Sequence, residues 1–88
     1  MEQNDDDVIY EYADKFINLA NEIAQSDRSG RVGIAIRFAA ARYCAYEASI
    51  RSKDLAEDKD KELQVFTDAF KEMLAYNLED YIKIVSQK

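Results

Sequence analysis

The chain has 88 residues with 18 acidic and 12 basic side chains, a net charge of −6, one cysteine, and neither histidine nor proline. This length makes a single domain whose hydrophobic core is close to the smallest that is stable alone, and one cysteine excludes a disulfide framework. No unbroken apolar run approaches the roughly 20 residues of a membrane-spanning helix, so the sequence excludes a transmembrane helix.

The first predicted element is a helix over about residues 7–25. Its apolar residues fall on one face at about 100° per residue: they are Ile9, Tyr12, Ala13, Phe16, Ala20, Ile23 and Ala24. Residues 25–31 read Gln-Ser-Asp-Arg-Ser-Gly-Arg and predict a turn, with Gly30 as its left-handed residue.

The second predicted helix, over about residues 31–53, carries two apolar stripes about 180° apart. The first stripe consists of Val32, Ile36, Ala39, Tyr43, Tyr46 and Ile50, and the second of Ile34, Phe38, Ala41 and Ala45. Arg37 and Arg42 lie on the two flanks between the stripes and are the only charged residues from Val32 to Tyr46. This helix therefore has two apolar faces, where a surface helix of a small domain needs one.

The third predicted helix spans about residues 58–86. No glycine or proline separates it from the second helix, and either Asp54 or Asp58 is suited to cap its start. Its apolar stripe has a spacing close to a heptad repeat: Leu63, Phe66, Phe70, Met73, Asn77, Tyr81 and Ile84. Asn77 is the polar residue of this stripe. It is either a hydrogen-bonded core residue that fixes register, or an edge residue with its amide in water.

Three helices joined by short turns predict an all-α fold, a three-helix antiparallel bundle over residues 1–88. Such a bundle needs one apolar face from each helix, so the second stripe of the central helix would remain in water. Exposed patches of this kind usually mark an interaction site. We therefore expect a homodimer, because two-fold dimers are the commonest oligomers, with Ile34, Phe38, Ala41 and Ala45 as the dimer interface.

Charge is distributed unevenly along the chain. Every arginine lies between Arg28 and Arg51, so residues 27–53 carry +4, while residues 1–26 carry −6 and residues 54–88 carry −4. An acidic whole disfavours nucleic-acid and anionic-membrane partners. Arg37 and Arg42 either form structural ion pairs with acids of the other two helices, the preferred interpretation, or bind a ligand anion. Arg28, Arg31, Arg51 and Lys53 are expected as solvated helix ends.

The residues that catalysis commonly needs are scarce. The absence of histidine removes the usual general base and the commonest metal ligand, so we expect no catalytic residues, no metal site and no cofactor. Cys44 is either a thiolate activated by nearby arginines or, preferably, a small buried apolar side chain. A single thiol without a signal-type segment also predicts a cytoplasmic location.

Three segments carry a family resemblance: "YEYADKFINLANEIA" (10–24), "FAAARYCAYEAS" (38–49) and "MLAYNLEDYI" (73–82). Together they resemble a small, mostly proteobacterial family known as domain of unknown function 3144. The chain departs from that pattern with Tyr43, Cys44 and Tyr46, where the family has Phe, Asn and Phe. The resemblance implies a short, all-helical, cytoplasmic bacterial protein and implies no activity.

Several functions remain open from the sequence. The main hypothesis is a non-enzymatic, self-associating interaction or accessory module. A helix of an unknown protein partner could occupy the same face, which would make the chain an adaptor. The alternative from another class is a small-ligand binder, in which Arg37, Arg42, Tyr43 and Tyr46 line a site between helices for an anionic or aromatic molecule. An enzyme dependent on Cys44 stands last.

Overall fold

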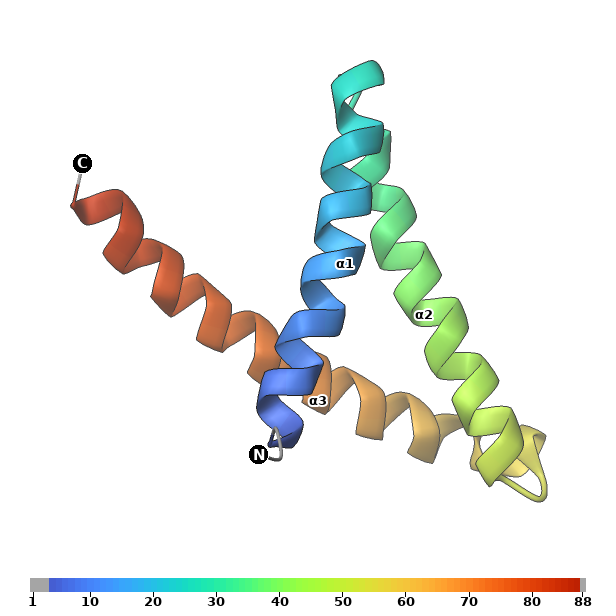
Figure 1. The fold of residues 1–88 in the computed structure, drawn as a ribbon. Helices are drawn as coiled ribbons and strands as arrows, with labels where there is room; N and C mark the ends of the chain where they lie inside the picture. The colour runs from blue at the N-terminus through green and yellow to red at the C-terminus, as the bar shows by residue number, and fades with distance from the viewer. Residues whose placement is uncertain (1–3, 88) are drawn as a thin grey trace. The chain divides into compact units, whose positions relative to one another are not determined.

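In a computed structural model of the protein, the structure is described for residues 4–87, which form three helices (Figure 1). They are α1 (Asp5–Ser26), α2 (Arg31–Arg51) and α3 (Leu55–Ser86), and there is no strand in the part of the chain that is described. The predicted all-α class with three helices is confirmed. No helix among residues 4–87 is both long enough and apolar enough to cross a membrane.

The start of α1 depends on a side chain that precedes it. The Asn4 side-chain oxygen accepts a hydrogen bond of 2.8 Å from the backbone N–H of Asp7, which satisfies one of the free donors of the first turn. Three acids occupy that turn, where the positive end of the helix dipole favours negative charge. These interactions start the helix at Asp5, two residues before the predicted position.

Packing divides the chain into two compact units, residues 1–43 and residues 44–88. The division falls inside α2, which is nevertheless one continuous helix. The two units are described separately below.

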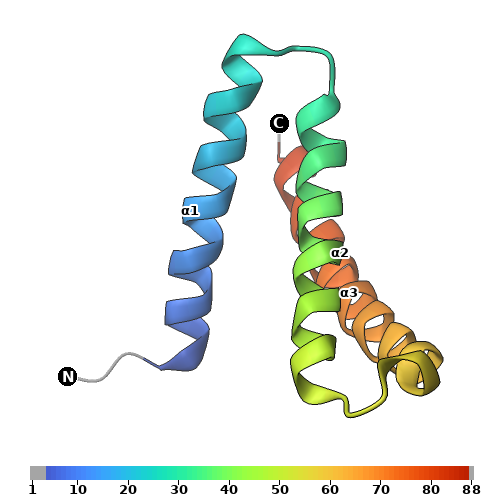
Figure 2. The ribbon, with the colours of Figure 1, turned by 90° about the vertical axis from the view of Figure 1, so that its right-hand side faces the viewer.

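In the first unit, α1 and the beginning of α2 run antiparallel on either side of a short turn (Figure 2). Gly30 has a φ angle of 90° in this turn, as predicted. The residues of α1 that become half-buried are mainly small: Ala13, Ala20 and Ala24. The large members of the predicted stripe stay outside the contact, and Phe16 is 67% exposed. The half-buried residues of α1 are therefore mainly alanines, and the bulky edge of α1 is not covered within this unit.

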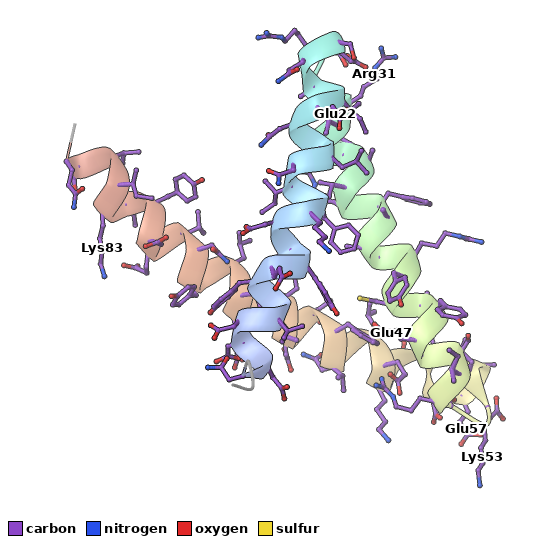
Figure 3. All side chains as sticks on the ribbon, in the orientation of Figure 1. Glu22, Arg31, Glu47, Lys53, Glu57 and Lys83 are labelled. Carbon is purple, nitrogen blue, oxygen red and sulfur yellow. The ribbon has the colours of Figure 1, made fainter. Side chains whose placement is uncertain are left out.

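In the second unit, a turn at residues 52–54 joins the end of α2 to the start of α3. Figure 3 labels Lys53 in this turn and Glu57 in the first turn of α3. The Ser52 hydroxyl donates to the Asp58 carboxylate at 2.7 Å and accepts from the backbone N–H of Asp54 at 3.2 Å. The Asp54 carboxylate accepts from the backbone N–H of Glu57, also at 3.2 Å. Asp54 is therefore the N-cap, so α3 starts at Leu55 and not at residue 58.

The buried residues among residues 4–87 are Ala48 and Glu62, which are 3% and 9% exposed and both belong to the second unit. The Glu62 carboxylate forms an ion pair with Arg51. The Arg51 guanidinium also lies 5.4 Å from the centre of the Phe66 ring, at cation–π distance. These contacts attach the first three turns of α3 to the end of α2. Beyond Phe66 the large apolar residues of α3 are exposed, among them Phe70, Met73, Leu74, Leu78 and Tyr81.

Candidate functional site: an exposed apolar seam on α2

The four residues predicted as a dimer interface form one line along α2. Ile34, Phe38, Ala41 and Ala45 are spaced by four, three and four residues, which keeps them on one face of a single helix. We call these four residues the α2 seam. All four are exposed, with Ile34 at 62% and Phe38 at 65%. The α2 seam is thus an apolar line: α1 leaves Ile34, Phe38 and Ala41 exposed in the first unit, and α3 leaves Ala45 exposed in the second unit.

The α2 seam has a defined end within the second unit. Its spacing continues to Ala48 and Ser52, but Ala48 is buried and the Ser52 hydroxyl is bonded to Asp58 of α3. The free part of this face therefore stops at Ala45. On the opposite stripe of α2, Val32 is half-buried in the hairpin with α1.

Arg37 and Arg42 flank the α2 seam. The salt bridges within residues 4–87 are Arg31 with Asp27 at 3.1 Å and Arg51 with Glu62, so neither flanking arginine forms one there. A Cβ atom placed on Gly33 would lie 3.6 Å from an Arg37 guanidinium nitrogen, which shows that this side chain folds back along its own helix. The ion pairs expected for Arg37 and Arg42 are thus not formed among these residues.

Two arginines expected as solvated helix ends have carboxylate partners. Hydrogen bonds from Ser29, followed by the bond to Arg31, lower the pKa of the Asp27 carboxyl below its ordinary value. The hydrogen bond to Glu62 and the charge of that carboxylate raise the pKa of Arg51. The Arg51 side chain is 55% exposed at the end of α2, as expected of a solvated helix end, but the sequence did not predict its ion pair with Glu62. The sequence signal that could have revealed it is Glu62, an acid on the margin of the α3 stripe.

The tyrosines of the ligand-binding hypothesis, Tyr43 and Tyr46, are exposed. Asn77 is exposed as well, and its amide nitrogen donates to the Met73 carbonyl of its own helix at 2.8 Å. Within residues 4–87, no three Cys, Asp or Glu side chains come together in a way that could hold a metal ion.

Cys44 is a free, half-buried thiol at the margin of the α2 seam. Replacing it with alanine is expected to change the thermal unfolding midpoint by no more than about 3 °C, because a partly exposed sulfur contributes little packing. Thermal unfolding followed by circular dichroism measures this change. A loss of 10 °C or more would show that the thiol is an essential packing group.

The helices and the α2 seam define a small all-α protein of three helices that presents an exposed apolar line. A model of the family described as "Protein of unknown function (DUF3144)" matches residues 9–82. The chain belongs to this family, as the resemblance in its three segments predicted. Neither the curated proteins nor the solved structures contain a match to the chain.

Proposed function

We propose that this protein is a non-enzymatic interaction module that associates with a second copy of itself through the α2 seam. The observation that carries the proposal is the exposure of Phe38 at the centre of a continuous apolar line on one regular helix. Contiguous apolar surface of this kind is uncommon on monomeric soluble proteins and usually marks an interface.

The energetics favour a covered seam. Burying an aromatic or branched aliphatic side chain contributes about 1.5–3 kcal/mol relative to leaving it in water. Phe38 and Ile34 are more than half exposed, so most of this contribution is not realised for either side chain within the units as described. A two-fold dimer covers the same residues on both copies at once, so each apolar contact contributes twice.

The chemistry of the chain is consistent with a role without catalysis. It has no histidine, and its one thiol is not accompanied by a second cysteine or a histidine base. A single free thiol suits a reducing compartment, and we place the module in the cytoplasm on that basis.

The test is the solution mass of the unmodified chain, measured by light scattering over a wide range of concentrations. We expect a mass of twice 10.2 kDa that falls toward the single-chain value on dilution. A single-chain mass at every concentration would overturn the proposal. The α2 seam would then be covered within its own chain or by a different molecule.

A further inference from the structure

The α2 seam follows the pattern of a coiled-coil contact. Alternating steps of four and three residues place Ile34 and Ala41 at d positions, and Phe38 and Ala45 at a positions, of a heptad repeat. In the same repeat, Arg37 occupies a g position and Arg42 an e position. These are the positions whose charges decide how two such helices are oriented relative to each other.

A parallel pair of α2 helices would bring like charges together. In that arrangement a g residue of one helix meets the e residue five positions later on the other helix. Arg37 of each copy would therefore lie against Arg42 of the other, which gives two repulsive contacts. No acidic residue from Val32 to Tyr46 is present on α2 to offset them.

An antiparallel pair removes both repulsive contacts. Residues of the g type then meet other g residues, and e residues meet e residues. When the free seam pairs with itself, Arg37 lies opposite Cys44 of the second copy, and Arg42 opposite Ala35. Neither position carries a charge.

The side-chain sizes match in the same antiparallel arrangement. Ile34 lies opposite Ala45 of the second copy, and Phe38 lies opposite Ala41, so every layer combines one large and one small residue. Such pairing fills the space between two helices whose axes are about 8–10 Å apart. In a parallel pair, Phe38 would face Phe38, and Ala41 would face Ala41.

We propose that two copies of this chain pair antiparallel through α2, with Ile34 against Ala45 and Phe38 against Ala41. The inference rests on the proposed self-association and adds its orientation and register. The register is also limited by the second unit, because α3 already occupies the face of α2 at Ala48 and Ser52. In the proposed register, each exposed residue of the α2 seam therefore faces an exposed residue of the α2 seam on the second copy.

Disulfide cross-linking tests the orientation. Ile34→Cys and Ala45→Cys are each made in a Cys44→Ala background, then oxidised alone and as an equimolar mixture. In the antiparallel pair, two copies of residue 45 are separated by about 16 Å along the helix axis, which no disulfide spans. We therefore expect cross-linked dimers in the mixture, containing one chain of each variant, and none in either variant alone.

The other outcomes separate the two proposals. Cross-linking of each variant with itself, without a cross-linked dimer that contains one chain of each variant in the mixture, would show a parallel pair; the register proposal would then be wrong while self-association through the α2 seam stands. A dimeric mass without any cross-link would place the interface elsewhere and overturn both proposals. A monomeric mass for the Cys44→Ala chain would also overturn both.

Discussion

Phe38→Glu is expected to convert the dimer into a folded monomer, with the apparent dissociation constant raised at least 100-fold. In the antiparallel pair, the substituted carboxylate would lie against Ala41 of the second copy, and the two-fold symmetry introduces this defect twice. Burying a carboxylate without a partner costs several kcal/mol, whereas in the monomer the same residue is 65% exposed. Light scattering over a range of concentrations measures the change in mass, and circular dichroism reports whether the helices persist.

Tyr76→Glu is the matched control for this prediction. Tyr76 is an aromatic residue of similar exposure, 67%, and it lies on α3, outside the α2 seam. We expect this variant to keep the mass of the unmodified chain. If Phe38→Glu leaves the mass unchanged, the α2 seam is not the interface. If Tyr76→Glu also yields a monomer, the effect comes from added negative charge on an already acidic chain and not from the α2 seam.

The second large effect concerns the ion pair that joins the end of α2 to α3. Arg51→Met is expected to destabilise the protein roughly twice as much as Glu62→Gln, because the two partners are buried to different extents. The Glu62 side chain is 11% exposed and the Arg51 side chain 55% exposed. Removing the arginine leaves a nearly buried carboxylate without its donor. Removing the negative charge leaves a guanidinium that water still reaches and that still donates to the glutamine oxygen.

Urea-induced unfolding, with both variants compared at one protein concentration, measures this difference. The double variant Arg51→Met with Glu62→Leu is the control, since it removes both charges and is expected to recover part of the loss caused by Arg51→Met alone. Equal losses for the two single variants would contradict the asymmetry. They would show that the Glu62 carboxylate is solvated once its partner is gone.

The three helices and the turn at Gly30 were predictable from the sequence, because apolar spacing and a glycine that can adopt a positive φ are local signals. The end of α2 was harder to predict from the sequence. A helix boundary without glycine or proline depends on hydrogen bonds such as that from Ser52 to Asp58, and two caps of similar chemistry were available in Asp54 and Asp58.

The α2 seam was predicted residue by residue, since a stripe on one regular helix needs only the periodicity of that helix. The partner of Arg51 was missed for the opposite reason. An ion pair between residues 11 positions apart depends on how the turn between them directs α3, and composition carries no information about that direction. The same limit applies to Arg37 and Arg42. The sequence contains more acidic residues than these two arginines could pair with, and it does not identify a partner for either of them.

The turn at residues 52–54 also has a consequence for which substitutions this chain can tolerate. Because no backbone conformation reserved for glycine is present there, the break between α2 and α3 depends on one hydroxyl group and one carboxylate. Each such bond is worth about 1 kcal/mol. Substitutions of Lys53, whose side chain makes neither bond, should accumulate freely. Loss of Ser52 or Asp54 instead removes one of these bonds and favours a merger of α2 and α3 into one longer helix.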